Sequence, residues 1–267
     1  MSSGAAAGLV PMTASRIPAD LTGRTAIVTG ASRGFGLGIS VALAAAGAHV
    51  VGVARAAGPL RALGERLHGS FTPVPGDAAD PAIADELVRA HKPSVLVLNA
   101  GAVPPMAPFH DMSWDDFSRS WRVDTRHAFH WAAAAITTPL PPDSVVVMVS
   151  SGAALRGSPV SGGYAGAKAA VRFISSYAAA ESARLGLGLR FVTLLPSLTP
   201  ATDLGTAAVA AYADRRGDDL STVVAGLRPF LTPEQVGQEV VGIVTDPATP
   251  AHVEYLLSDK GREVLPR

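Results

Sequence analysis

The sequence Arg24-Thr-Ala-Ile-Val-Thr29 runs directly into Gly30-Ala-Ser-Arg-Gly34-Phe-Gly36-Leu-Gly38, and this stretch decides the fold. Its first part is short, apolar and β-branched, which predicts a buried strand. An apolar helix is predicted at residues 39–46, ended by Gly47 at its C-cap, before a second strand at residues 48–53. Glycines in such a first turn let the backbone turn tightly and approach a pyrophosphate, which the unpaired N–H groups of the helix start would bind. The stretch therefore predicts a dinucleotide-binding β-α-β unit; the alternative is a tight turn of small residues.

The remainder of the chain alternates strand and helix signals. Further strands are predicted at residues 70–75, 94–98, 144–149, 188–195 and 253–257, and helices at residues 80–90, 111–137, 161–185 and 233–245. Repeated βα units imply an α/β fold with a Rossmann-type doubly wound parallel sheet. The length of 267 residues suits a single domain.

The first twenty residues differ from the rest. Residues 1–20 are rich in small side chains and lack the basic start and sustained apolar core of a signal peptide. We expect a disordered leader there, followed by one dinucleotide-binding domain over residues 21–267.

Charge and cysteine content exclude several classes of protein. Lys plus Arg number 22 and Asp plus Glu number 22, so no basic excess points to nucleic acid or an anionic membrane as a partner. The chain has no cysteine, which excludes disulfides, thiolate catalysis and cysteine-ligated zinc. This is compatible with a reducing cytoplasm, where we expect the protein. Hydrophobic residues make up 48% and charged residues 16%, which indicates thickly buried strands and a surface for subunit contact.

A tyrosine and a lysine stand four residues apart in the helix predicted at residues 161–185. Tyr164 and Lys168 therefore share one face of that helix. The ammonium favours phenolate and lowers the pKa of the tyrosine towards the working pH, where a general acid or base works best. Ser151 ends the strand before this helix, at the sheet edge where the glycine turn would deliver a dinucleotide. The alternative is a half-buried packing tyrosine beside a solvated lysine.

These motifs together resemble the classical short-chain dehydrogenase/reductase (SDR) family. The family's Thr-Gly-x-x-x-Gly-x-Gly turn is matched at residues 29–36, and its Asn-Asn-Ala-Gly at Leu98-Asn99-Ala100-Gly101, with the first Asn replaced. Its catalytic Ser, Tyr and Lys fall on the three residues above, and its Pro-Gly on Pro196-Ser197, with Gly replaced. The resemblance runs from about residue 21 to residue 200. It implies an oxidoreductase that transfers a hydride between a nicotinamide cofactor and a carbonyl or alcohol carbon.

Two arginines indicate the form of the cofactor. NAD-preferring dinucleotide folds usually place an acid at the end of the second strand, where this chain has Ala54 followed by Arg55. With Arg33 in the glycine turn, Arg55 could bind a 2′-phosphate in forked fashion, which favours NADP(H); the alternative is that both are merely solvated. The cofactor contacts expected from the resemblance are Gly30, Ser32, Arg33, Gly34, Phe35, Gly36, Arg55, Asp77, Asn99, Ala100, Gly101, Tyr164, Lys168, Pro196 and Thr202.

The resemblance also implies catalytic roles. Tyr164 would protonate the developing alkoxide, Lys168 would lower the pKa of Tyr164 and bind the nicotinamide ribose, and Ser151 would hydrogen-bond the substrate oxygen. Neighbouring Ser150 is interpreted as structural.

A fourth catalytic position, Asn in many members, is Asp124 here. We hypothesise that its charge stabilises protonated Lys168 and opposes ionisation of Tyr164, which would move the pH optimum upward. The alternative is an aspartate turned away or hydrogen-bonded to backbone.

The substrate pocket should be formed by residues 99–112 and by a variable substrate-binding region at about residues 198–231. Its apolar candidates are Val103, Met106, Phe109, Leu204 and Tyr212, which indicate an uncharged, partly hydrophobic ketone or aldehyde. No metal is expected; His127 and His130, three residues apart, are interpreted as a pair on a helix face, with a metal site as the alternative.

The resemblance further implies a homodimer or homotetramer paired through the two long helices. The replacements at Asp124 and Ser197 keep a second function open, a catalytically weak or inactive dinucleotide-sensing or scaffold protein on the same fold.

Overall fold

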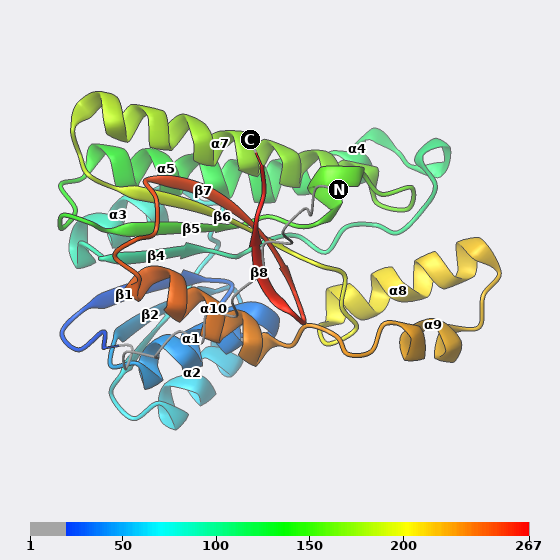
Figure 1. The fold of residues 1–267 in the computed structure, drawn as a ribbon, viewed down its shortest axis with the longest axis horizontal. Helices are drawn as coiled ribbons and strands as arrows, with labels where there is room; N and C mark the ends of the chain where they lie inside the picture. Colours follow the sequence, from blue (N-terminus) through cyan, green and yellow to red (C-terminus); the bar gives the residue numbers. More distant parts are fainter. Residues whose placement is uncertain (1–19, 267) are drawn as a thin grey trace, which may run out of the picture.

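The computed structural model describes residues 20–266, so the leader expected at residues 1–20 lies outside the described residues except for Asp20. Its centre is one eight-stranded sheet with the order β3-β2-β1-β4-β5-β6-β7-β8 (Figure 1). All neighbouring strands are parallel except β7 and β8. The strands are β1 (Thr25–Thr29), β2 (His49–Ala54), β3 (Phe71–Pro75), β4 (Val95–Leu98), β5 (Val145–Val149), β6 (Arg190–Pro196), β7 (His252–Ser258) and β8 (Gly261–Val264).

Helices cover both faces of the sheet, as predicted for a doubly wound fold (Figure 1). One face carries α1 (Gly34–Ala45), α2 (Ala57–Arg66) and α10 (Pro233–Thr245), and the other carries α3 (Pro81–His91), α5 (Arg126–Thr137) and α7 (Gly162–Leu185). Each face has its own apolar core, because strands covered on both sides are buried on both sides. The protein therefore has the Rossmann-type architecture that the sequence predicts.

The sequence signals missed several elements. The helix α2 contains Gly58, Pro59 and Gly64 and buries only Leu60 and Leu63, so its apolar signal is weak. The strand β8 is four residues long and partly exposed, and it becomes a strand by pairing antiparallel with β7. The variable region contains α8 (Asp203–Arg216) and α9 (Leu220–Gly226), which extend beyond the carboxyl ends of the strands (Figure 1).

The helix predicted at residues 111–137 is not a continuous α-helix. A 3₁₀ turn at Phe109–Asp111 and a short helix α4 (Trp114–Phe117) precede a π-helical turn η2 (Trp121–Thr125), which continues into α5. In the π turn the N–H of Arg126 donates to the carbonyl of Trp121, five residues back. Such turns accommodate one extra residue in a helix and are frequent at functional sites.

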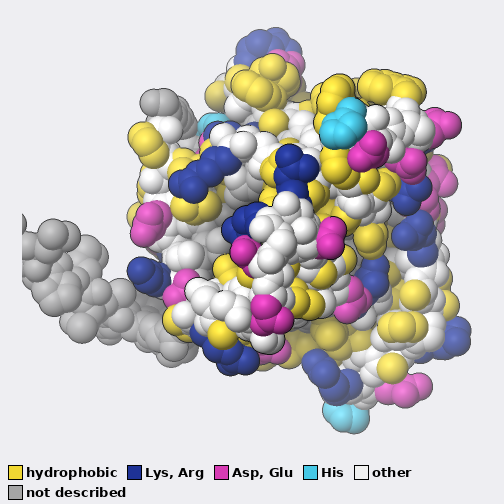
Figure 2. Space-filling model, turned by 90° about the vertical axis from the view of Figure 1, so that its right-hand side faces the viewer, with side chains coloured by type: hydrophobic (Ala, Val, Ile, Leu, Met, Phe, Trp, Pro, Cys, Tyr) yellow, Lys and Arg dark blue, Asp and Glu magenta, His cyan; other side chains and the backbone are white. Residues whose placement is uncertain are grey.

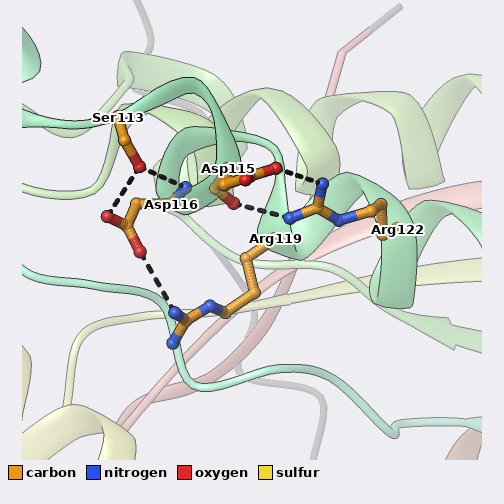
Figure 3. Close-up of polar contacts among 5 residues, drawn as sticks. All are labelled: Ser113, Asp115, Asp116, Arg119 and Arg122. Carbon is orange, nitrogen blue, oxygen red and sulfur yellow. Dashed lines mark hydrogen bonds and ion pairs between the residues drawn. The ribbon is translucent and has the colours of Figure 1, made fainter.

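The start of α4 is fixed by a cap and by exposed ion pairs (Figure 3). The Ser113 hydroxyl accepts from the Asp116 N–H at 3.1 Å, as expected for a cap, and donates to the Asp116 carboxylate at 2.8 Å. Arg119 donates to Asp116 at 3.1 Å, and Arg122 donates to the Asp115 carboxylate at 2.9 Å. These contacts tie the first turns of the long helix together where it meets α7.

A glycine lets α4 pack directly on the beginning of α7. A Cβ added to Gly163 would lie 1.9 Å from the carbonyl oxygen of Phe117, so another residue there would force the two helices apart. Because Gly163 immediately precedes Tyr164, this close contact helps to set the position of the tyrosine.

On the side of the molecule that carries α8 and α9, the surface is neither predominantly positive nor predominantly negative. Figure 2 shows basic and acidic side chains intermixed on this face, in keeping with the balanced composition. Within residues 20–266, no helix has both the length and the apolarity needed to cross a bilayer.

Candidate active site

A large cleft lies at the carboxyl ends of the parallel strands. Its volume is about 1840 Å³, and its walls come from the glycine turn, the ends of β2, β4, β5 and β6, the start of α7 and the first half of the region 198–231. Pockets for a single small molecule usually measure about 300–1,000 Å³. The cleft is therefore large enough for a dinucleotide together with a small substrate.

The glycine turn has the backbone form that a phosphate-binding turn requires. Gly30 and Gly34 have φ values of +70° and +54°, in the left-handed region that favours glycine. The helix α1 starts at Gly34 with its N–H groups beside the cleft. These features fit a pyrophosphate group.

Of the described residues predicted to touch the cofactor, Gly36 alone does not line the cleft. The lining includes Gly30, Ser32, Arg33, Gly34, Phe35, Arg55, Asp77, Asn99, Ala100, Gly101, Tyr164, Lys168, Pro196 and Thr202. Gly36 is buried, and a Cβ there would lie 2.1 Å from the carbonyl oxygen of Gly30. Gly36 therefore packs the helix closely on the turn, and its expected contact with the cofactor stays a prediction.

A threonine joins the ends of two central strands under the cleft. The Thr29 hydroxyl accepts from the N–H groups of Asn99 and Ala100 at 2.9 and 3.1 Å. The Asn99 amide in turn donates to the Thr29 carbonyl at 3.0 Å. These bonds fix the loop after β4 against the glycine turn.

Tyr164, Lys168 and Ser151 lie together in the cleft, as predicted from their spacing. Ser151 hydrogen-bonds the Tyr164 side chain, and the Lys168 Nζ lies 5.7 Å from the centre of the tyrosine ring. Lys168 also donates to the carbonyl of Val149 at 3.1 Å. The Ser150 hydroxyl donates to the Lys168 carbonyl at 2.8 Å and so joins the end of β5 to α7, which matches the structural role expected for it.

Asp124, in the π turn, forms a direct buried ion pair with the lysine. Its Oδ2 lies 3.2 Å from the Lys168 Nζ, and the two side chains are 0% and 6% exposed. Its Oδ1 accepts from the backbone N–H of Ala102 at 2.8 Å. The carboxylate thus makes both contacts that the sequence presented as alternatives, one to the ammonium and one to backbone.

The pKa of Tyr164 is raised, whereas the sequence predicts that it is lowered. Burial raises the pKa of the Tyr164 phenol and outweighs the lowering by the Lys168 charge and the Ser151 hydrogen bond; the Asp124 charge acts in the same direction as burial. The expected lowering of this pKa is therefore wrong for the free protein. Burial alone would lower the pKa of Lys168, but the charges of Asp124 and Tyr164 together raise it. Lys168 therefore stays protonated and positively charged.

His127 is part of the same buried cluster, which the sequence did not predict. Burial and the neighbouring Lys168 charge lower the pKa of His127 to about 3, although its ring hydrogen-bonds the backbone of Ala100. The imidazole is therefore neutral at ordinary pH. His127 is 2% exposed and lines the cleft, whereas His130 on the next turn stacks edge-to-face with Phe129. The two histidines, predicted as a pair on a helix face, thus differ in their surroundings, since His127 is buried and His130 is half-buried.

The arginines predicted to bind a 2′-phosphate both stand at the cleft. Arg55 is exposed at the end of β2. Arg33 forms an ion pair with Asp203, the first residue of α8, at 2.9 Å. Thr202 caps α8, since its hydroxyl accepts from the Gly205 N–H at 3.1 Å.

The other end of the cleft combines apolar side chains with hydroxyls. Val103, Met106 and Leu204 line it, as predicted. Phe109 does not line the cleft, in contrast to the prediction. It is 74% exposed and packs edge-to-face against Phe117. Tyr212 also lines the cleft, and its hydroxyl lies 2.6 Å from the Ser158 hydroxyl, which also accepts from the Ser161 hydroxyl at 2.7 Å.

Known proteins with the same pattern were found by sequence and by structure. Residues 24–213 match the model of the short chain dehydrogenase family. The chain is 34% identical to D-erythrulose reductase of Gallus gallus over 60% of its own length and 65% of that enzyme, slightly less than two thirds. It is 30% identical to L-rhamnose 1-dehydrogenase (NAD(P)(+)) of Sphingomonas sp. (strain SKA58) over 91% of this chain and 98% of that enzyme. A proposed NAD(P) dependent gluconate 5-dehydrogenase of Beutenbergia cavernae, solved with NADP at low occupancy, has a TM-score of 0.75 at 27% identity, over 90% of this chain and 96% of that one.

The chain therefore belongs to the short-chain dehydrogenase family. Members of this family are oxidoreductases that use NAD(P)(H), and the relatives of this chain include dehydrogenases and reductases of sugars and polyols.

Proposed function

We propose that the protein is an NADP(H)-dependent oxidoreductase that interconverts a carbonyl group and a secondary alcohol on a small uncharged substrate. The observation that carries the proposal is that half-buried Tyr164 and Ser151 and buried Lys168 lie together in the same cleft as the glycine turn. A general acid, a cation beside it and a hydroxyl donor together form the set needed to reduce a carbonyl group.

Each residue of this cluster has a distinct task in the proposed reaction. When bound, the nicotinamide would supply or accept the hydride at the substrate carbon. Ser151 holds the substrate oxygen by a hydrogen bond, and the Tyr164 hydroxyl donates its proton to that oxygen during reduction. Lys168 stays cationic beside Asp124 and stabilises the phenolate that is left. The raised pKa keeps the Tyr164 phenol protonated at neutral pH, which is the form that donates a proton during reduction.

The cofactor would be held by groups of the glycine turn and of the neighbouring strand ends. Gly30, Gly34 and the start of α1 would receive the pyrophosphate, and Asp77 and Asn99 would border the adenine and nicotinamide parts respectively. Arg33 and Arg55 favour a 2′-phosphate, since neither offers the carboxylate that would bind ribose hydroxyls and repel that phosphate.

The substrate proposed is a short hydroxylated ketone or polyol. Ser158 and Tyr212 present hydroxyls to the cleft beside apolar Val103, Met106 and Leu204. A polar but uncharged lining of this kind suits substrate hydroxyls together with a short carbon chain. Relatives named as D-erythrulose reductase, L-xylulose reductase and D-threitol dehydrogenase support this class of substrate.

The first test is equilibrium binding of NADPH and of NADH to the wild type and to Arg55→Ala. We expect tight NADPH binding that weakens in the variant, with little change for NADH, because only NADPH carries the phosphate that Arg55 would contact. The second step is NADPH oxidation with short hydroxyketones, and Tyr164→Phe should bind NADPH normally but lose turnover. Absence of binding by either cofactor to the folded protein would overturn the proposal.

One observation favours a second function, a dinucleotide-sensing or scaffold protein with weak activity or none. Burial and the Asp124 charge both raise the pKa of Tyr164, which opposes formation of phenolate. Tight NADPH binding without turnover on any hydroxyketone or polyol, in either direction and up to alkaline pH, would favour this function over the first.

We further propose a cytoplasmic homodimer or homotetramer paired through α5 and α7. Large aromatic side chains on these helices are exposed, with Phe129 at 57%, Phe173 at 61% and Tyr177 at 66%. Analytical ultracentrifugation of the wild type and of Phe173→Asp tests this proposal, which predicts that the charged variant dissociates.

A further inference from the structure

The exposed pair of Arg33 and Asp203 joins two parts of the cleft that are far apart in the sequence. Arg33 directly precedes α1 in the glycine turn, and Asp203 is the first residue of α8, 170 positions later. The Arg33 Nη1 donates to the Asp203 Oδ2 at 2.9 Å, and the side chains are 63% and 77% exposed. This pair therefore lies at the rim of the cleft, open to solvent.

A second contact beside the pair shows that α8 meets the glycine turn at this point. A Cβ added to Gly34 would lie 3.6 Å from the methyl group of Thr202, an ordinary van der Waals distance. Thr202 caps α8 and thereby fixes the direction of its first turn, which contains Asp203. The carboxylate is thus held at the rim by a capped helix and is directed at the guanidinium.

Arg33 cannot keep this pair unchanged if it also binds a ribose phosphate. The guanidinium would have to turn from the carboxylate or share its N–H groups with the phosphate. A shared arrangement would place two anions together, and like charges at that separation repel. NADH has no 2′-phosphate, so the Arg33 guanidinium can keep its ion pair with Asp203 when NADH binds.

We propose that Asp203 is a residue that determines cofactor specificity, because it competes with the 2′-phosphate of NADPH for Arg33. The inference rests on the proposed function, in which Arg33 faces that phosphate. NADPH releases the first turn of α8 from the glycine turn, whereas NADH leaves it attached. Asp203 thereby limits the preference for NADPH that the two arginines would otherwise give.

The test is the dissociation constant of NADPH and of NADH for the wild type, Asp203→Asn and Asp214→Asn, at low and high ionic strength. Exposed ion pairs contribute up to about fivefold in an equilibrium constant, so Asp203→Asn should tighten NADPH binding by about that factor and leave NADH unchanged. Asp214→Asn is the matched control, because it removes the same charge from the exposed far end of α8. The difference should shrink at high ionic strength.

A double-mutant cycle isolates the pair itself. In an Arg33→Ala background, Asp203→Asn should no longer change the ratio of the two dissociation constants. An equal change for both cofactors, no change, or the same change in the Arg33→Ala background would overturn the inference while the proposed function stands. Failure of the folded wild type to bind either cofactor overturns the proposed function and the inference together, so the two failures are distinguishable.

Discussion

The cleft contains two ion pairs of similar chemistry in opposite surroundings. Lys168 and Asp124 are 6% and 0% exposed and are 3.2 Å apart, whereas Arg33 and Asp203 are 63% and 77% exposed and are 2.9 Å apart. Distance alone would rank the exposed pair as the stronger. Burial reverses that ranking, because removing one partner of a buried pair leaves an uncompensated charge, while water replaces a partner at the surface.

The difference indicates two kinds of role. The buried pair fixes the charge beside Tyr164, and replacing either partner should lower stability strongly. The exposed pair can separate when another anion binds Arg33, and dissolved salt weakens the attraction between its two charges. Four changes to the chain would break or sharpen this contrast. Three are given in order of decreasing effect on stability, and the fourth is measured by the pH dependence of the reaction.

Asp124→Ala should break the buried pair and have the largest effect on stability. Lys168 would keep the Val149 carbonyl as a partner but lose its counter-ion. The free energy of unfolding should fall by about 3–5 kcal/mol, measured by urea denaturation. Asp203→Ala is the matched control and should lose less than about 1 kcal/mol. Equal losses in the two variants would contradict the contrast.

His127→Gln should change the response of stability to acid. The pKa of His127 in the folded protein is about 3, below its unfolded value of 6.5, so the unfolded chain binds the proton first as pH falls. This group therefore costs nothing well above pH 6.5 and lowers stability progressively between pH 6.5 and pH 3. Between pH 7 and pH 5 the wild type should lose about 2 kcal/mol more than the variant.

The control for this change is His110→Gln, because His110 is exposed. Urea denaturation at several pH values should give the wild type and this control the same acid sensitivity. If His127→Gln loses stability as steeply as the wild type, the histidine is not held neutral beside Lys168.

Tyr212→Phe should have a smaller effect, at the outer end of the cleft. It leaves Ser158 without the hydroxyl that lies 2.6 Å away. Loss of one part-buried hydrogen bond should lower the free energy of unfolding by about 1 kcal/mol, as measured by urea denaturation. A loss above that of Asp124→Ala would show that burial does not order these contacts.

Asp124→Asn should lower stability less than Asp124→Ala does, since an amide can still accept from the Ala102 N–H. Its effect should appear in the pH dependence of alcohol oxidation, which needs the phenolate. The Asp124 charge raises the pKa of Tyr164, so its removal should move the rise in rate to lower pH. Profiles of kcat against pH that superimpose on the wild type would rule out this effect of the charge.

The sequence predicts which residues come together in the site better than it predicts their pKa values and ion pairs. Tyr164, Lys168 and Ser151 follow from helix spacing and from a strand end, which are local properties. The pKa of Tyr164 depends on how far the phenol is buried and on the charges of Lys168 and Asp124, and the fold decides both. The sequence predicts a cofactor contact for Arg33, but it does not predict the ion pair with Asp203, which spans 170 positions and depends on the fold.

Weak local signals account for the missed elements. The helix α2 carries helix-disfavouring Gly58, Pro59 and Gly64, and β8 depends on an antiparallel partner. The spacing of His127 from His130 predicts a pair on a helix face, but it does not show that His127 is buried, which depends on what packs against α5. Propensity and spacing describe the chain alone, whereas these features come from contacts between distant segments.

The π turn at residues 121–125 also has a consequence for insertions and deletions. The long helix is anchored before this turn by Phe117 against Gly163, and after it by the Trp131 indole, which donates to the Ala78 carbonyl at 2.8 Å. Each residue of an α-helix advances it by about 100°, so deleting one residue from the turn would rotate one anchor away from its partner. The number of residues between Phe117 and Trp131 is therefore constrained, whatever the identity of those residues.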